Sequence, residues 1–506
     1  MILHGKEARE KLMEGVNLVA DTVVGTLGPK AKTVVIKQNG RPVVINDGVT
    51  IAKAVWSDDP FIQMGVELVQ EVASQAQNKS GDGTTTSIIL ARELCRSGMK
   101  DITDAGIDPV TLKKELDTIA NDIVEHLNAI ARPINGRGDL ENVATIAANN
   151  DAELGLLIAD IVEDIGKDGV ISVEDGQNAE TTYSVIDGME LDRGYVHHVM
   201  VNKPDEGYCE FEDALVLITN DSLNNFQDIH PILDISLKEK KPLLIIAKEI
   251  ESDGLNGLLL NLAAERIRAC AIRAPEWGDD QVEVLNDICA LLGGKVFNST
   301  VGDDFSKATL EDLGQATKIR VSRTHTMLIN DNSDQETLNE RVKLLASQLD
   351  NQTNDWFAEK LHRRIGKLTG GVAVVKVGAA TETELRERKE RLDDALNATK
   401  CAVQEGIVVG GGMALYDWSK EESFYQAFSA PSRVIAANAG IHLNEERLKD
   451  GIGFNANRNV YENLLEAGII DPVKVTKNAV LTATSIAGLV LTTNVLVGEK
   501  EEPQWG

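Results

Sequence analysis

The order of structural patterns along this chain constrains its fold most, because helix-forming sequence at both ends encloses a middle part of strands and helices. Apolar residues at helical spacing predict helices over residues 7–24, 60–78, 84–99 and 109–131. Two short strands are expected over 33–37 and 42–45, followed by a tight turn at Asp47-Gly48. Helical sequence returns after residue 405. We therefore expect the two chain ends to close one helical domain around an inserted domain.

The middle part begins near Arg132–Gly136, a segment with Pro and Gly that is typical of a connection between domains. Beyond it, strands are predicted over 169–173, 181–185, 214–219 and 243–247, and helices over 224–240 and 253–267. Strands that alternate with helices indicate an α/β domain. Two long charged helices are predicted over 341–367 and 383–405. The predicted fold class is therefore a multidomain α+β and α/β protein.

Length and charge exclude several classes of protein. At 506 residues the chain is too long for one hydrophobic core. Its 51 basic and 80 acidic residues give a formal charge of −29, which argues against nucleic acid or an anionic membrane as partner. The five cysteines form no C-x-x-C pair, so neither a zinc site nor a disulfide framework is expected. With no signal-peptide pattern and no apolar stretch suited to a bilayer, we expect a soluble cytoplasmic protein.

The run Gly81-Asp82-Gly83-Thr84-Thr85-Thr86 carries the strongest functional signal. Its glycines let the backbone bend and bring N–H groups close to an anion, and the following apolar residues predict a helix whose N-terminus favours phosphate. Asp82 offers the kind of oxygen ligand that Mg²⁺ prefers. Runs of this composition are also common as turns with local side-chain caps, so the run alone leaves both interpretations open.

Further short motifs lie in both end segments of the chain. They are Thr26–Pro29, Asn46–Val49, Asp393–Leu396, Gly410–Gly412 and Ile470–Pro472. If the two ends fold together, these motifs can converge on one pocket. The sequence contains neither the G-x-x-x-x-G-K-[ST] motif of a P-loop nor a G-x-G-x-x-G motif after a strand. A phosphate site here would therefore belong to neither of those two classes.

In their order and amino-acid sequence these segments resemble the group I chaperonins, the 60-kDa family of bacteria and organelles. The resemblance runs almost from end to end and includes Leu27-Gly28-Pro29-Lys30, Asp47-Gly48-Val49, Gly81–Thr86, Gly169–Gly176, Asp192-Arg193-Gly194-Tyr195, Lys241–Ala247, Ala308–Gln315, Lys376–Glu382 and Asp471–Thr476. It implies a chaperonin fold with a mainly helical equatorial ATP-binding domain (1–129 and 405–506), a hinge-like intermediate domain (130–186 and 373–404) and an inserted α/β apical domain (187–372).

The resemblance also implies roles for individual residues with ATP, Mg²⁺ and K⁺ as cofactors. Leu27, Gly28 and Pro29 would line the nucleotide, Gly83, Thr84, Thr85 and Thr86 would hold the phosphates, and Asp82 would ligate Mg²⁺. Thr26 and Thr85 would lie near K⁺. Gly411 and Gly412 would pack against the ribose, Asp471 would bond its hydroxyls, and Asn455 and Ala456 would contact adenine.

Two carboxylates would do the chemistry in this interpretation. Asp47 and Asp394 would flank the attacking water, with Asp394 brought in by the intermediate domain. Hydrolysis of a phosphoanhydride needs such a carboxylate beside a metal and phosphate donors. Without the resemblance, the simpler interpretation of Asp394 is an ordinary acid on a helix surface.

Substrate contact is assigned to an apolar set in the middle part of the chain. Its members are Tyr195, Val199, Met200, Leu233, Leu255, Leu259 and Leu260, which would form an exposed patch for non-native polypeptides. Periodicity alone explains each of them equally well as a core residue. The chain departs from the family at His197, His198 and His230 within this region, which could make the patch sensitive to pH.

We therefore expect an ATP-hydrolysing chaperone that forms a homo-oligomeric ring, sevenfold, and acts on non-native polypeptides. The chain is shorter than typical members between Leu415 and Gly451, and His442 replaces the glutamate that usually partners Arg433 at the contact between rings. A single or a double ring and a co-chaperonin partner both stay open, and a virus-encoded member would suit these departures. The alternatives are a passive holdase with a weak or uncoupled ATPase, or a chaperonin fold that serves as a scaffold or as a different ATP-dependent enzyme such as a kinase.

Overall fold

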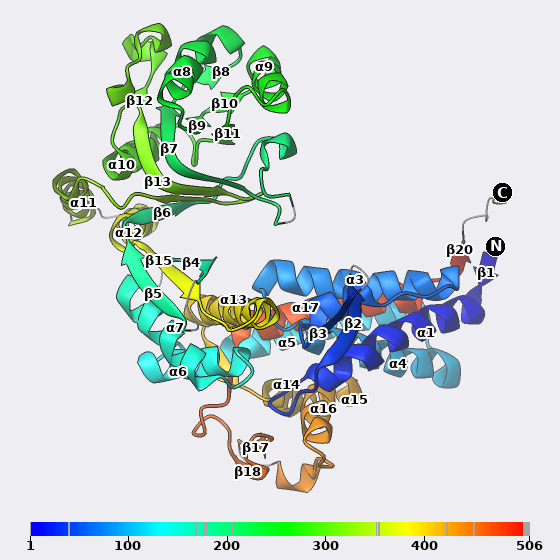
Figure 1. Cartoon of the computed structure of the whole chain (residues 1–506). Coiled ribbons are helices and arrows are strands. Elements are labelled where there is room, and N and C mark those ends of the chain that lie inside the picture. Colours follow the sequence, from blue (N-terminus) through cyan, green and yellow to red (C-terminus); the bar gives the residue numbers. More distant parts are fainter. Residues whose placement is uncertain are drawn as a thin grey trace. The chain divides into compact units, whose positions relative to one another are not determined.

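The computed structural model describes residues 2–38, 41–166, 169–176, 180–204, 206–350, 352, 355–420, 424–448 and 451–498. It divides into two compact units. Unit 1 joins residues 1–160 to 379–506, and unit 2 consists of residues 161–378. Both ends of the chain therefore build unit 1, and their first and last strands lie side by side (Figure 1). The finer division into three domains stays a prediction.

Unit 1 consists mainly of helices. They are α1 (Gly5–Val23), α2 (Gly48–Ala54), α3 (Pro60–Ser80), α4 (Thr84–Lys100), α5 (Pro109–Ile130), α6 (Arg137–Ala147), α13 (Glu382–Glu405), α14 (Met413–Ser419), α15 (Tyr425–Phe428), α16 (Ala430–Asn438) and α17 (Val473–Thr492), and α7 (Ala152–Ile165) extends across residue 160. Helices α3 and α5 begin at an aspartate cap followed by proline, Asp59-Pro60 and Asp108-Pro109, which is why their starts were predictable.

The core of unit 1 forms where these helices pack closely. A Cβ at Gly15 would lie 2.2 Å from the carbonyl oxygen of Ile62, so α1 and α3 approach at a distance that only glycine permits. Helix α17 packs against α3, α4 and α5. It is the one helix in the described part of the chain whose length and composition would suit a membrane span, yet 61% of its apolar window is buried inside the protein. That burial is typical of a core helix.

Short strand pairs hold the segments of unit 1 together. They are β1 (Ile2–His4) with β20 (Val495–Val497), β2 (Val34–Gln38) with β3 (Arg41–Ile45), β16 (Ile407–Val409) with β19 (Ile470–Pro472), and β17 (Ile452–Asn455) with β18 (Val460–Asn463), all antiparallel. The β16–β19 pair places Asp471 beside the segment that leads to Gly410.

Unit 2 contains the predicted strands and helices of an α/β fold. Its larger sheet has the order β11-β9-β7-β13-β14-β6, with β12 also paired to β7. The strands are β6 (Gly188–Leu191), β7 (Cys209–Thr219), β9 (Leu243–Ala247), β11 (Ala269–Arg273), β12 (Val296–Phe297), β13 (Gly314–Val321) and β14 (Thr326–Ile329). Strands β7, β9 and β11 run parallel, and β9 is buried along its whole length because both faces of the sheet are covered.

The other elements of unit 2 are α8 (Phe226–Glu239), α9 (Ser252–Ala263), α10 (Asp279–Leu292), α11 (Gln335–Asp350) and α12 (Asp355–Thr369), with the short pair β8 (Ser222–Leu223) and β10 (Glu249–Ile250). A second sheet has the order β4 (Val170–Asp175), β15 (Val372–Val377), β5 (Thr182–Ile186). The strands that the sequence predicts over 169–173, 181–185, 214–219 and 243–247 correspond to β4, β5, β7 and β9.

Two local predictions were wrong, and one helix was missed. The single helix expected over 341–367 is two helices, α11 and α12, and Gln352 between them belongs to neither. Asp47-Gly48 is no tight turn: Asp47 caps α2 and accepts hydrogen bonds from the N–H groups of Val49 (3.2 Å) and Thr50 (2.8 Å). The connection expected after Arg132 is followed directly by α6, which the sequence interpretation missed.

Candidate functional site

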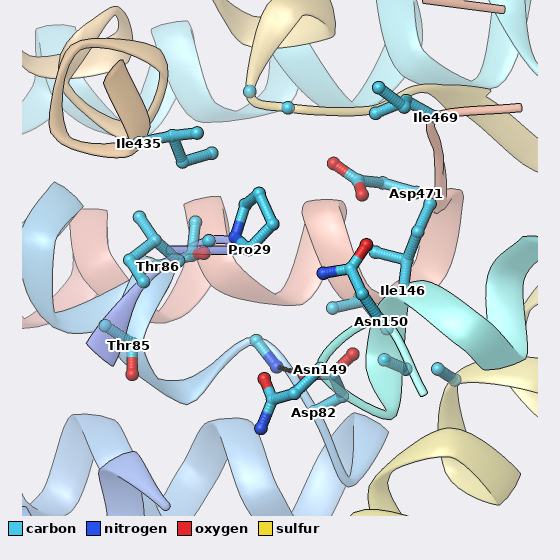
Figure 2. A pocket seen from close by; sticks show the side chains of 18 of the residues that line it. Pro29, Asp82, Thr85, Thr86, Ile146, Asn149, Asn150, Ile435, Ile469 and Asp471 are labelled. Carbon is cyan, nitrogen blue, oxygen red and sulfur yellow. Dashed lines mark hydrogen bonds between the residues drawn. The ribbon is translucent and has the colours of Figure 1, made fainter. Parts of the chain in front are cut away.

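A cavity of about 430 Å³ in unit 1 is lined by residues from both ends of the chain. Figure 2 shows side chains around it, among them Pro29, Asp82, Asn150 and Asp471. Every nucleotide-site residue expected from the sequence lines this cavity: Thr26, Leu27, Gly28, Pro29, Asp47, Asp82, Gly83, Thr84, Thr85, Thr86, Asp394, Gly411, Gly412, Asn455, Ala456 and Asp471. Folding of the two ends into one unit thus brings motifs more than 400 residues apart into one place.

The turn between α3 and α4 forms one wall of the cavity. Gly81 ends α3 and Gly83 precedes α4, with φ values of 64° and 81°, the left-handed region that glycine adopts without strain. Asp82 accepts a hydrogen bond from the N–H of Gly83 at 2.5 Å. No side chain caps α4 at Gly83, so the helix presents its first N–H groups, together with the hydroxyls of the threonines, to the cavity. Such a helix N-terminus favours an anion.

The Thr26–Pro29 segment lies against this turn. The hydroxyl groups of Thr26 and Thr85 are 3.2 Å apart. Asn438 of α16 fixes the segment from behind, because its amide donates hydrogen bonds to the carbonyl oxygens of Val24 (2.9 Å) and Leu27 (2.8 Å). Sequence reasoning missed Asn438, which stands in no recognisable motif.

Five carboxyl groups line the cavity: Asp47, Asp82, Glu390, Asp394 and Asp471. Burial, and then the charges of neighbouring carboxylates, raise the pKa of Asp394 to about 9 and that of Glu390 to about 7. Burial and the charge of Asp82 raise the pKa of Asp471 to about 7. Burial also raises the pKa of Asp82, against the opposing hydrogen bond from Gly83. Several carboxyl groups in one cavity lower the stability of the folded protein unless a cation binds beside them.

The opposite wall is formed by Gly410–Gly412, β19 and α16. A Cβ at Gly410 would lie 2.9 Å from the N atom of Ile470, and one at Gly412 would lie 2.8 Å from Ser432 Oγ, so glycine is required for the close approach. Ser432 donates a hydrogen bond to the carbonyl oxygen of Gly411 at 2.9 Å. The wall is thus a tightly packed backbone surface against which a flat group can lie.

The remaining wall is more apolar. Pro29, Ile146, Phe454, Ala456 and Ile469 line it, and Ile435 faces the same space. Asn455 also lines the cavity, but its own amide is used within its loop: it donates to Glu462 Oε1 at 2.7 Å and accepts from the N–H of Asn457 at 3.0 Å. Apolar walls with few polar groups are typical of pockets for aromatic ligands.

Sequence reasoning missed several residues at the α6–α7 connection. Asn149 and Asn150 line the cavity with φ values of 56° and 65°. Two adjacent non-glycine residues in the left-handed region are uncommon and store strain, which proteins keep mainly where it serves function. The pair Asn-Asn after an apolar helix was the available signal, because asparagine tolerates this conformation best.

The apolar set assigned to substrate contact is only partly exposed in unit 2. Leu260 is 71% exposed and Val199 40%, and Tyr195, Leu255 and Leu259 are half-buried. The expectation of an exposed patch was wrong for Met200 and Leu233, which are 3% and 4% exposed. Met200 packs into the core, where its sulfur accepts the N–H of Ala271 at 3.3 Å, and Leu233 lies on the face of α8 that covers the sheet. His197, His198 and His230 lie at or near the surface.

Comparison with known proteins identifies the family of this chain. The model of the TCP-1/cpn60 chaperonin family matches residues 19–501. The chaperonin GroEL of Methanoregula boonei is 42% identical over 98% of this chain and 96% of its own length.

Among solved structures, the chaperonin gp146 from bacteriophage EL 2 (Pseudomonas aeruginosa), crystallised in presence of ATP-BeFx, has a similar fold at 20% identity. One crystal form gives a TM-score of 0.74 over 99% of this chain and 100% of that chain, and a second form gives 0.67 over 99% of each. The protein therefore has the chaperonin fold and belongs to the TCP-1/cpn60 chaperonin family.

Proposed function

We propose that this chaperonin hydrolyses ATP in the cavity of unit 1 and uses the reaction to drive binding and release of non-native polypeptides. The observation that carries the proposal is the juxtaposition of an uncapped helix N-terminus with a group of carboxyls in one cavity. The helix end suits the phosphates and the carboxyls suit a divalent cation. Together they match the needs of phosphoryl transfer to water.

The α3–α4 turn would hold the triphosphate and its metal. Backbone N–H groups from Gly83 to Thr86 and the threonine hydroxyls would donate to the phosphate oxygens. Burial raises the pKa of Asp82, so a bound cation would stabilise its charged form, and this carboxyl fits a magnesium ligand. Mg²⁺ would also neutralise charge on the phosphates. The neighbouring hydroxyls of Thr26 and Thr85 would offer oxygen ligands to K⁺.

Asp47 and Asp394 would orient the attacking water. Asp47 is fixed because its oxygens accept two N–H groups at the start of α2. Asp394 makes no hydrogen bond or ion pair with any described residue, so its carboxyl is available to the reactants. The apolar wall with Asn455 and Ala456 would take adenine, and Asp471 beside Gly411 and Gly412 would bond the ribose.

Exposed apolar residues of unit 2 would receive the polypeptide. Leu260 and Val199 are the most exposed members of the expected set. A homo-oligomeric ring in the cytoplasm, with the equatorial, intermediate and apical domains expected from the sequence, belongs to the same proposal, and a co-chaperonin remains an open partner. Arg433 pairs with Glu445 of its own chain at 3.3 Å, so at the predicted contact between rings it already has a partner.

The test compares wild type with Asp394→Ala. The variant should bind a fluorescent ATP analogue with unchanged affinity and release inorganic phosphate about 10²-fold more slowly, a loss typical of misplacing a reactant by about 1 Å. Undiminished turnover would remove Asp394 from the mechanism. The refolding yield of a denatured substrate with and without ATP separates this proposal from a passive holdase, because a holdase gives the same yield in both. Transfer of the labelled γ-phosphate to anything but water would favour a kinase.

A further inference from the structure

Glu390 is an unpartnered acid at the edge of the cavity. Its side chain is half-buried, it lines the cavity, and it makes no hydrogen bond or ion pair with any residue that the structure describes. A half-buried carboxyl without a partner lowers stability, because burial removes water from the charged form without replacing it. Such a group in a cleft is a candidate for function.

The other acids of the same helix surface differ from it. On α13, Glu384 pairs with Arg388 at 2.9 Å and Glu387 pairs with Arg391 at 2.5 Å. These i,i+4 pairs are what a solvated helix face is expected to form. Glu390 instead lies one turn before Asp394, on the face of α13 that lines the cavity. Glu390 therefore lies on the side of α13 that faces the cavity and not on the side that faces solvent.

Asp47 is the strongest charged neighbour of Glu390. The two carboxyls are in different situations, because both oxygens of Asp47 already accept backbone N–H groups, at 3.2 and 2.8 Å. These bonds occupy acceptor positions on both oxygens of Asp47. Glu390 has no such bond, so of the two it is the one free to accept a proton.

We infer that Glu390 accepts the proton of the attacking water while Asp47 and Asp394 orient that water. The inference rests on the proposed ATP hydrolysis. In the step, the water oxygen bonds to the γ-phosphorus, the bond from that phosphorus to the β–γ bridging oxygen breaks, and the water proton moves to the carboxylate of Glu390. ADP and inorganic phosphate leave, and the proton passes to solvent, so no oxidant, reductant or further reactant is needed.

The surroundings of Glu390 suit this role near neutral pH. Burial, followed by the charge of Asp47, raises its pKa to about 7, where a carboxylate is a stronger base yet still largely ionised at slightly alkaline pH. The charged groups that face it are Asp47 from the start of α2 and Arg386, Glu387, Asp393 and Asp394 from its own helix. Of these charged groups, Arg386 lowers the pKa of Glu390, and Asp47, Glu387 and Asp393 raise it.

The experiment measures phosphate release against pH, from pH 6 to 9, for wild type, Glu390→Gln and Glu390→Asp in the assembled full-length protein with saturating Mg²⁺ and ATP. The matched control is Glu382→Gln, which removes a charge from a side chain of α13 that is 90% exposed. Wild type should lose rate below neutral pH, and Glu390→Gln should lower kcat about 10²-fold at pH 8 and lack that decline. Glu390→Asp should recover part of the rate, and Glu382→Gln should match wild type.

Each result decides the question. If Glu390→Gln keeps kcat within twofold and keeps the wild-type pH profile while Asp394→Ala is inactive, the inference about Glu390 is wrong and the proposed function stands. If wild type binds no ATP or releases no phosphate from it, the proposed function itself fails. A purely structural role of Glu390 would lower the thermal midpoint of Glu390→Gln without changing the shape of the pH profile, and would also overturn the inference.

Discussion

Replacing Gly81 by alanine tests how closely the α3–α4 turn fits against α13. Gly81 has a φ of 64°, and a Cβ built there would lie 2.3 Å from Asn397 Nδ2 and 2.5 Å from Asn397 Cβ. The left-handed conformation costs an alanine about 1–2 kcal/mol. Forcing an extra carbon into filled space costs about 1–3 kcal/mol more. We therefore expect Gly81→Ala to lower the free energy of unfolding by about 2–5 kcal/mol.

The chain supplies a control with the same backbone conformation and no clash. Gly106 has a φ of 67°, and nothing lies within 4 Å of a Cβ built on it. Gly106→Ala should therefore show the cost of conformation alone, about 1–2 kcal/mol. Differential scanning calorimetry of the two variants separates the terms, because 1 kcal/mol shifts the midpoint by roughly 2–4 °C in a domain of 150–250 residues.

A second substitution isolates the contact with Asn397. The atoms closest to the added Cβ all belong to that side chain, so Gly81→Ala combined with Asn397→Gly should be more stable than the sum of the two single variants predicts. Asn397 follows Asp394 on α13, so Gly81→Ala should also slow ATP hydrolysis. Equal midpoints for Gly81→Ala and Gly106→Ala, or strict additivity in the double variant, would refute the close fit.

Three further predictions follow from single side chains. Because the pKa of Asp394 is about 9, the folded state loses stability relative to the unfolded state as the pH rises from about 4 to 9. In protein without Mg²⁺ or nucleotide, Asp394→Asn should therefore raise the thermal midpoint at pH 8 and leave it unchanged at pH 4. Asn438→Ala removes two hydrogen bonds to the 24–27 segment and should cost about 1–3 kcal/mol in urea unfolding and weaken nucleotide binding. Leu260→Ser should reduce capture of a denatured polypeptide, while its thermal midpoint stays within about 2 °C of wild type because surface substitutions change stability little. Leu233→Ser, at a site that is 4% exposed, should lower the midpoint strongly.

The sequence predicted those parts of the fold that local chemistry determines. Helices α3 and α5 were predicted from apolar residues at helical spacing, and in the structure an aspartate cap followed by proline starts each of them. The buried strand β9 was predicted because it is a continuous apolar run. The local signal at Asp47 was misleading, because an Asp-Gly pair is common in tight turns. In the structure the residues that follow it form α2, and Asp47 caps that helix. Local signals are reliable where the neighbouring sequence offers no competing structure.

Non-local features could not be derived in that way. The convergence of Gly81–Thr86 with Asp471 depends on the pairing of β16 with β19, and the burial of Met200 depends on a strand that lies far from it in the sequence. Glu390 was not singled out on the charged helix predicted over 383–405, because the sequence does not show which face of that helix meets the cavity. The turn at Asn149 and Asn150 was likewise hidden, since its strained conformation follows from how α6 and α7 are joined.

The grouping of the carboxyls also determines how nucleotide and metal can enter. The triphosphate alone would meet five acids, and repulsion would oppose the attraction of the α4 N-terminus. Mg²⁺ alone would meet acids that hold protons, because burial and then the charges of neighbouring carboxylates raise the pKa of Asp394 and Asp471. A magnesium–ATP complex avoids both penalties, since its metal lowers the pKa of the carboxyls while its phosphates occupy the helix end. From the distribution of charge in the cavity we therefore expect the protein to bind the magnesium–ATP complex more tightly than either component alone.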